Sequence, residues 1–377
     1  MWLIDSNTIR LQFVTSAGSS PYAILSHTWN DNDEVTFQEF NSPDRDIAHP
    51  RFLKIMETCR LARGRGIPYV WVDSCCIDKT SSAELTEAIN SMFRWYREST
   101  TCFTYIADLA VGSEIEPDLP KCKWFTRGWT LQELVAPRNV EFYDKSWNLI
   151  GDKISLLKAL IEITRIQEDA LRDSDSLPNH TVAMRMSWAA NRQTTREEDL
   201  AYCLLGISDV YLPLIYGEGI NAFIRLQEAI GQVTYDLSLF AWTDQDSTET
   251  RQRYHGILAR SPAEFSDCSS VWKPGTWIFP THEYTITNKG VRLTGHLYDG
   301  PNEAEDFLFN LECWGPNEAG LVFIRLVQTP SGYVRHCADT VTCLPWEDAE
   351  KLQVILHWNV HGIFHFRLWT LAAAALA

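Results

Sequence analysis

One carboxylate stands out in this sequence because of its neighbours. Glu133 lies in the segment 124–134, four residues after Trp129 and close to Arg127. Residues four apart on a helix share a face, so the Glu133 and Trp129 side chains would line the same wall. A carboxylate in the middle of a helix and outside any run of solvated charges is a candidate functional residue. The alternative is a solvated surface carboxylate, the usual state of a single helical Glu.

Other polar residues follow short apolar runs. Ser26 and His27 close the run that begins at Tyr22, and Asp73 closes the run that begins at Tyr69. Ligands of open parallel sheets bind at the carboxyl ends of the strands, so these side chains would meet at one edge. Polar residues end most strands, and this pattern alone leaves a ligand cleft and an ordinary loop edge equally open.

A parallel sheet is needed to position these residues. The runs 22–26, 69–73, 102–106 and 140–143 are apolar and nearly continuous, as expected of strands buried on both faces. The segment between the second and third runs has the clearest helical period, and Ser81 and Glu84 have the spacing of a capping box before it. The pattern predicts an α/β domain over residues 1–150, with a helix 123–135 that ends before Pro137.

The rest of the chain divides into two further parts. Residues 151–236 have mostly helical patterns, including a stretch opened by Thr195 and Glu198, and predict a helical extension. Residues 237–377 predict a separate antiparallel β-rich domain. Its expected strands are 276–279, 284–287, 291–298, 307–313, 321–327 and 333–337. The apolar end 368–377 is too short to cross a bilayer, and we interpret it as a truncated or misjoined end.

Composition excludes several classes of partner and site. The net charge of -16 repels nucleic acid and anionic membranes, so neither is expected as a partner. Ten cysteines without a Cys-x-x-Cys motif indicate reduced thiols and a cytoplasmic location. P-loop, serine-hydrolase and zincin motifs are missing. His357, His361 and His365 are spaced four apart, but Gly362 and nearby aromatic residues favour packing roles, so no metal or cofactor is expected.

Three segments resemble the signature blocks of the fungal heterokaryon incompatibility (HET) domain. They are Tyr-Ala-Ile-Leu-Ser-His-Thr-Trp at 22–29, Val-Trp-Val-Asp-Ser-Cys-Cys-Ile-Asp-Lys at 70–79, and Trp-Phe-Thr-Arg-Gly-Trp-Thr-Leu-Gln-Glu-Leu at 124–134. Further similar runs extend the resemblance to about residue 240. The family is understood to trigger cell death when incompatible fungal cells fuse.

The resemblance implies a flavodoxin-like, TIR-related fold, because HET domains are considered distant relatives of TIR domains, some of which cleave NAD. The catalytic Glu of TIR-type NAD hydrolases lies in a Trp-x-x-x-Glu helix after the third strand, which here matches Trp129 and Glu133. Glu133 would then be catalytic, Arg127 would meet the pyrophosphate, and Trp29 or Trp129 would stack on a ring. Both tryptophans could instead be core residues. The implied substrate-binding set is Ser26, His27, Trp29, Asp73, Arg127 and Trp129.

Two functions follow as expectations. The first is an NAD hydrolase that becomes active on self-association into a homo-oligomer and takes NAD or a related nucleotide as its substrate. The second is a non-enzymatic homotypic module in which the β-rich domain recognises an incompatibility partner protein. A metal-dependent nuclease is a weaker third, because no ordered metal-ligand spacing accompanies the acidic strand ends.

Overall fold

The computed structural model divides the chain into two compact units. It describes residues 1–29, 33–244, 254–273, 284–288, 290–293, 297–300, 306–315, 320–330 and 332–350, and the backbone of 354–356 and 362–364. The first unit comprises 1–177, 192–207 and 211–214, and the second comprises 178–191, 208–210 and 215–377. The helical stretch 151–236 therefore contributes to both units.

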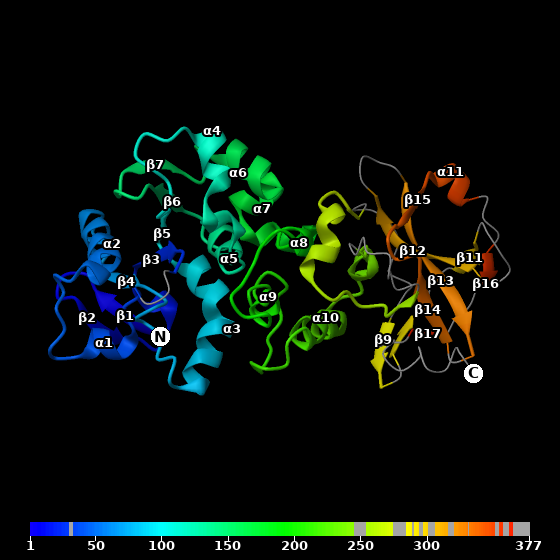
Figure 1. Cartoon of the computed structure of the whole chain (residues 1–377), viewed down its shortest axis with the longest axis horizontal. Coiled ribbons are helices and arrows are strands. Elements are labelled where there is room, and N and C mark those ends of the chain that lie inside the picture. Colours follow the sequence, from blue (N-terminus) through cyan, green and yellow to red (C-terminus); the bar gives the residue numbers. More distant parts are fainter. Residues whose placement is uncertain are drawn as a thin grey trace. The chain divides into compact units, whose positions relative to one another are not determined.

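The first unit is built on a seven-stranded sheet in the order β2-β1-β4-β3-β5-β6-β7 (Figure 1). Its central strands are parallel: β3 (Tyr22–His27), β4 (Tyr69–Trp71), β5 (Thr101–Tyr105) and β6 (Val140–Tyr143). The apolar runs predicted these four strands. They lie side by side in the order β4-β3-β5-β6 at the centre of the sheet.

The sheet is mixed, whereas the sequence predicted a parallel one. Antiparallel strands complete both edges: β1 (Trp2–Asp5) and β2 (Arg10–Phe13) beside β4, and β7 (Leu149–Asp152) beside β6. β2 and β7 are short and mostly exposed or half-buried. Edge strands of this kind lack the continuous apolar run of a strand buried on both faces, so the criterion used on the sequence could not detect them.

Chain direction places the helices on the two faces of this sheet. The connections from β3 to β4 and from β4 to β5 run in opposite directions along the sheet. Right-handed crossovers therefore put α2 (Leu53–Gly64) and α3 (Ser82–Glu98) on opposite faces. The connection from β5 to β6 continues in the second direction, which places α5 (Thr130–Val135) on the α3 face. The packing of Trp71 on β4 is consistent with the position of α3. Its ring lies edge-on against the rings of Trp95 and Tyr96 of α3, with centroid distances of 5.6 Å and 6.0 Å.

The start of α3 was predicted correctly, although its capping differs in detail. The Ser81 hydroxyl accepts a hydrogen bond from the Glu84 amide at 3.3 Å, as a helix cap should. The Glu84 carboxylate, however, accepts from the Asp78 amide at 3.0 Å instead of returning to Ser81. It thereby ties α3 to the loop that follows β4.

The predicted helix 123–135 is two elements. Residues Lys123–Thr126 form a 3-10 turn, and α5 begins only at Thr130, because Arg127 leaves helical geometry to bridge with Gln193. The far end of α5 is held by the buried Lys153, whose ammonium donates to the carbonyls of Val135 and Pro137 at 3.3 Å and 2.8 Å. The remaining helices of this unit are α1 (Phe37–Asn41), α4 (Ile115–Asp118), α6 (Leu157–Thr164), α7 (Glu168–Arg172) and α9 (Asp199–Tyr202).

The second unit holds a ten-stranded sheet in which only β14 and β17 pair in parallel among the described strands. Its strands are β8 (Tyr254–His255), β9 (Tyr284–Thr287), β10 (Gly290–Leu293), β11 (Leu297–Asp299), β12 (Asp306–Trp314), β13 (Leu321–Thr329), β14 (Gly332–His336), β15 (Thr342–Leu344), β16 (Val354–Leu356) and β17 (Gly362–Phe364). Its helices are α8 (Val182–Ser187), α10 (Asn221–Val233) and α11 (Trp346–Ala349).

The β-rich character predicted for the carboxyl-terminal part is confirmed. The predicted strand 284–287 is β9, and 307–313, 321–327 and 333–337 fall on β12, β13 and β14. The prediction of one strand over 291–298 is wrong, because β10 and β11 lie there as two strands that pair with different neighbours. The predicted strand 276–279 and the end 368–377 lie outside the described residues. Among the helices that the structure describes, none has the length and apolar character needed to cross a membrane.

Close packing between α3 and the segment 192–207 gives a test of the fold of the first unit. A Cβ at Gly206 would lie 2.0 Å from the Cβ of Phe93, so Gly206→Ala should lower the free energy of unfolding by about 2–3 kcal/mol through overpacking. Gly64→Ala is the matched control, since a Cβ there meets nothing within 4 Å and should leave stability unchanged or slightly raised. Urea unfolding monitored by tryptophan fluorescence compares the two, and equal stability of both variants would contradict the packing.

Candidate functional site

Ser26 and Glu133 meet in a buried hydrogen-bonded chain. The Ser26 hydroxyl, near the end of β3, donates to the Glu133 carboxylate at 2.5 Å and accepts from the indole N–H of Trp124 at 2.8 Å. Glu133 is only 4% exposed, and Ser26 and Trp124 are fully buried. This series of hydrogen bonds links β3, the 3-10 turn and α5 at the carboxyl edge of the parallel strands. The sequence prediction that Glu133 and the end of the first strand belong to one site is consistent with this arrangement.

Burial dominates the electrostatics of Glu133. Desolvation, assisted by the negative charge of Asp73, raises the pKa of Glu133 to about 8. The hydrogen bond from Ser26, the nearby Tyr96 hydroxyl and the positive charge of Arg192 act in the opposite direction but do not outweigh burial. Glu133 is therefore mostly protonated at neutral pH in this conformation.

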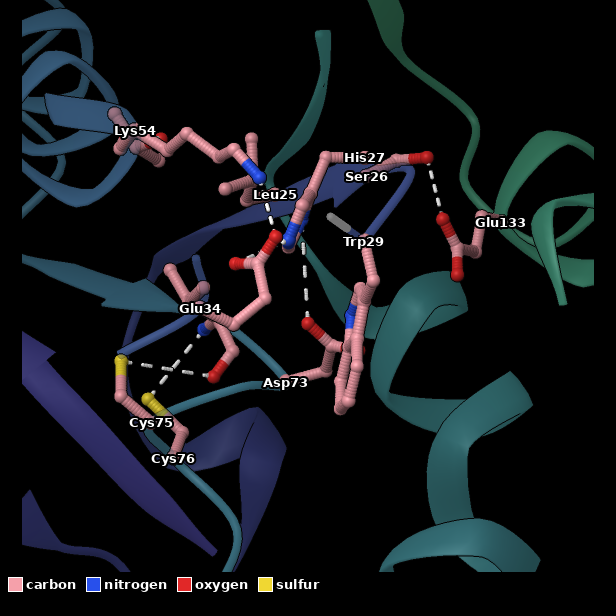
Figure 2. Close-up of polar contacts among 12 residues, drawn as sticks. Leu25, Ser26, His27, Trp29, Glu34, Lys54, Asp73, Cys75, Cys76 and Glu133 are labelled. Atoms are coloured by element: carbon pink, nitrogen blue, oxygen red, sulfur yellow. Dashed lines mark hydrogen bonds and ion pairs between the residues drawn. The ribbon is translucent and has the colours of Figure 1, made fainter. Parts of the chain in front are cut away.

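His27 belongs to a different cluster from Ser26. Successive side chains of a strand point to opposite faces, and Figure 2 shows Ser26 directed toward Glu133 and His27 toward Glu34 and Asp73. The His27 Nε2 atom lies 3.2 Å from Glu34 Oε2, and its Nδ1 atom lies 4.0 Å from Asp73 Oδ1. Burial alone would raise the pKa of Glu34, but hydrogen bonds and charges from His27 and Lys54 outweigh it and hold that pKa at about 2.

Asp73 and Trp29 form the rim of this second cluster. The indole N–H of Trp29 donates to Asp73 Oδ2 at 2.8 Å, and the ammonium of Lys79 lies 3.5 Å from the centroid of the Trp29 ring. Trp29 is 41% exposed, so it is not a core residue. The other Asp73 oxygen, Oδ1, is buried and accepts no hydrogen bond within the described structure. An acceptor of this kind is suited to a hydroxyl or amine donor of a ligand.

Arg127 and Trp129 lie at the start of α5. The Arg127 guanidinium donates to the Thr195 hydroxyl at 3.3 Å. Trp129 is half-buried and occupies the cap position of α5 with helical backbone angles, φ -61° and ψ -35°. The one-turn spacing between Trp129 and Glu133 is therefore kept, even though the helix is shorter than predicted.

Several residues of the site were not identified from the sequence. Trp124 opens the third signature block, and Tyr96 lies in the apolar stripe of α3, so both had a local signal. Glu34, Lys54 and Arg192 had none, because their importance depends on contacts between segments distant in the chain.

No group of three or more His, Cys, Asp or Glu side chains within the described residues could hold a metal ion. His357, His361 and His365 lie outside these residues. The described site brings together a carboxylate with neighbouring hydroxyl, indole and imidazole groups.

Comparison with known proteins identifies the domain that contains this edge of the sheet. The family model described as "Heterokaryon incompatibility protein (HET)" matches residues 22–119. The chain is also 48% identical over 221 residues to the vegetative incompatibility protein HET-E-1 of Podospora anserina. The chain carries a HET domain. The alignment with HET-E-1 covers 56% of this chain and 16% of that protein, so the chain spans only a small part of this relative's length. No solved structure matches.

The family match covers the strand-end residues of the HET domain but stops before α5. Ser26, His27, Trp29 and Asp73 lie within residues 22–119, whereas Glu133 lies after them. The structure brings the two parts together through the Ser26–Glu133 hydrogen bond.

The raised pKa of Glu133 predicts a pH-dependent stability effect. The folded state holds the Glu133 proton more tightly than the unfolded chain does, so wild-type stability should fall as the pH rises from about 4.5 to about 8. Glu133→Gln removes this loss and should be more stable than wild type by on the order of 4 kcal/mol near pH 8.5, while the two should be similar near pH 5. Urea unfolding across this pH range measures the difference.

Glu162→Gln is the matched control for this measurement. Glu162 lies on α6 with a 60% exposed side chain and pairs only loosely with Lys158 at 3.7 Å, so its substitution should not change the pH dependence. Parallel pH profiles for wild type and Glu133→Gln would contradict the buried protonated carboxyl.

Proposed function

We propose that this HET domain cleaves the nicotinamide–ribose bond of NAD with Glu133 as the catalytic carboxylate. The observation that carries the proposal is the buried Glu133 carboxyl, hydrogen-bonded to Ser26 at the carboxyl end of a central parallel strand. In the biological role that we propose, cleavage follows self-association and signals cell death in vegetative incompatibility, the process after which the Podospora relative is named.

The topology of the parallel strands supports a flavodoxin-like, TIR-related domain. Numbered in chain order, the parallel strands β3, β4, β5 and β6 lie in the order 2-1-3-4. This is the order at the centre of flavodoxin-like sheets, whose ligands bind where the strand order reverses. Here the reversal lies between β3 and β5, and Ser26 and His27 end β3 at this point.

The proposed reaction requires little acid catalysis. Nicotinamide leaves the cationic glycoside as a neutral molecule, and water adds to the ribose carbon to give ADP-ribose and a proton. An ionised Glu133 would hold the ribose hydroxyls and stabilise the oxocarbenium-like transition state. The free Asp73 Oδ1 atom would accept a hydrogen bond from the substrate, the exposed Trp29 ring would stack on a base, and Arg127 would meet the pyrophosphate.

Nicotinamide release from NAD tests this proposal directly. In protein assembled on a multivalent scaffold, Glu133→Gln should lower the rate at least about a hundredfold, because it removes the charge that stabilises the transition state. Glu162→Gln, a change of the same kind on exposed α6, should leave the rate unaltered. Full NAD consumption by the assembled Glu133→Gln protein would refute the catalytic role.

The pH dependence of the same reaction should report Glu133. Only the ionised carboxylate is active in this mechanism, so the rate should rise about tenfold per pH unit below the pKa near 8 and level off above it. Initial rates of nicotinamide release between about pH 6 and pH 9.5 measure the profile. A rate independent of pH over this range would show that ionisation of Glu133 does not limit the reaction.

A second function is favoured by the burial of Glu133. A carboxyl that is 4% exposed and mostly protonated at neutral pH is also what a purely structural residue would look like. In this alternative, the HET domain spreads a death signal through homotypic contacts, and the β-rich unit recognises an incompatibility partner protein. Cell death triggered by an assembled protein that releases no nicotinamide would favour this function.

A further inference from the structure

A segment that follows α8 in the chain lies against the start of α5. We call residues 192–195 the strap. The Gln193 amide donates to the Thr126 carbonyl at 2.6 Å, and the Gln193 carbonyl accepts from the Gly128 amide at 2.8 Å. The strap therefore runs along residues 126–128, directly before the helix that carries Glu133. It begins at the residue where the chain re-enters the first unit.

Gly128 is what allows the strap to approach so closely. A Cβ at this position would lie 2.6 Å from the Thr194 Cγ2 atom and 3.2 Å from the Cys203 sulfur. The contact of 2.6 Å would force the Thr194 side chain of the strap to shift. The packing of the strap at Thr194 thus depends on the missing side chain of residue 128.

Arg192 joins the strap to α5 and to the partners of Glu133. It is 6% exposed, and its Nη1 atom donates to the Arg127 carbonyl at 2.8 Å and to the Thr130 hydroxyl at 2.9 Å. Thr130 is the first residue of α5, and its hydroxyl in turn donates to the carbonyl of Trp124 at 2.5 Å. Trp124 is the residue that donates to Ser26, the hydroxyl bonded to Glu133.

The titratable groups that face Glu133 come from several elements. Asp73 follows β4, Tyr96 belongs to α3, Cys102 belongs to β5, and Arg192 belongs to the strap. Asp73 opposes ionisation of Glu133, while Arg192 and the nearby Tyr96 hydroxyl favour it. Burial lowers the pKa of Arg192 to about 10, which still leaves it charged at neutral pH.

We propose that Arg192 is a positioning residue for Glu133, which holds the start of α5 through its contacts with Arg127 and Thr130 and places a buried positive charge at this end of the helix. Its contribution to catalysis rests on the proposed NAD hydrolysis. The effect of Arg192 on the ionisation of Glu133 is independent of that proposed activity.

Stability measurements test the ionisation directly. The pH at which the stability difference between a protein and its Glu133→Gln counterpart levels off reports the folded-state pKa of Glu133. Arg192→Gln should move this point upward, because it removes a buried positive charge that favours the ionised carboxylate. In the Glu133→Gln background, Arg192→Gln should have an effect that does not vary with pH. An unmoved levelling point, or a pH-dependent effect that persists without Glu133, would overturn the proposal.

Displacing the strap gives a second test that leaves every charged residue in place. Gly128→Ala should shift the levelling point in the same direction as Arg192→Gln, because the new Cβ pushes the strap away. Adding Thr194→Ala removes the methyl group that this Cβ would strike and should reverse most of the shift. A Gly128→Ala protein with an unshifted levelling point would contradict the dependence on strap position.

The pH profile of nicotinamide release separates the role of Arg192 from the proposed function. In assembled protein, Arg192→Gln should shift this profile by the same interval as the stability profile. A shift in stability without any nicotinamide release in wild type would sink NAD hydrolysis and leave the electrostatic role of Arg192 supported. Release with an unshifted profile in Arg192→Gln would count against Arg192 alone.

Discussion

The burial of one carboxyl group governs the arrangement of this site. An ionised carboxylate in a dry environment is strongly destabilising unless hydrogen bonds and opposite charges compensate it. Glu133 has one close hydroxyl donor in Ser26 and receives opposing influences from Asp73 and Arg192, so its neutral form prevails near pH 7. The buried polar groups around it are correspondingly linked into a chain: Trp124 donates to Ser26, and Thr130 donates to Trp124. Such linkage is what a buried polar network needs in order not to be costly.

The geometry of β3 explains why the polar residues form two clusters instead of one cleft. Ser26 and His27 are adjacent, so the strand pleat directs them to opposite faces of the sheet, one toward α5 and one toward Glu34 and Lys54. Asp73 connects the clusters, because it lies 4.0 Å from His27 and its charge also reaches Glu133. In the proposed reaction, the substrate would have to reach Glu133 on one side of this edge and Asp73 and Trp29 on the other.

Much of this fold could be predicted from local patterns, and the rest depends on contacts that local patterns do not carry. The central strands and α3 could be predicted because both signals, a continuous apolar run and a helical period, are carried by consecutive residues. Local patterns did not predict the edge strands β2 and β7, because exposed edges have no apolar run. They also did not predict the break between the 3-10 turn and α5, which arises from the bridge between Arg127 and Gln193. The same limit applies to the site. Ser26 and Glu133 were predicted as site residues from motifs, whereas Arg192 contacts α5 from a segment far along the chain and has no local signal.

Protonation and exposure of Glu133 must be coupled. In the described conformation the pKa of Glu133 is about 8, whereas a hydrated Glu has a pKa near 4.5. Any rearrangement that exposes the carboxyl to water therefore releases close to one proton at neutral pH, and it becomes easier as the pH rises. A change that brings more positive charge close to Glu133 also favours release of its proton, without exposing the carboxyl to water. For a domain that would have to remain silent until it assembles, this coupling offers a physical basis for two states, a closed neutral one and an open or compensated ionised one. The free-energy difference between the neutral and the ionised state then depends on the positions of the strap, Asp73 and α5 relative to Glu133.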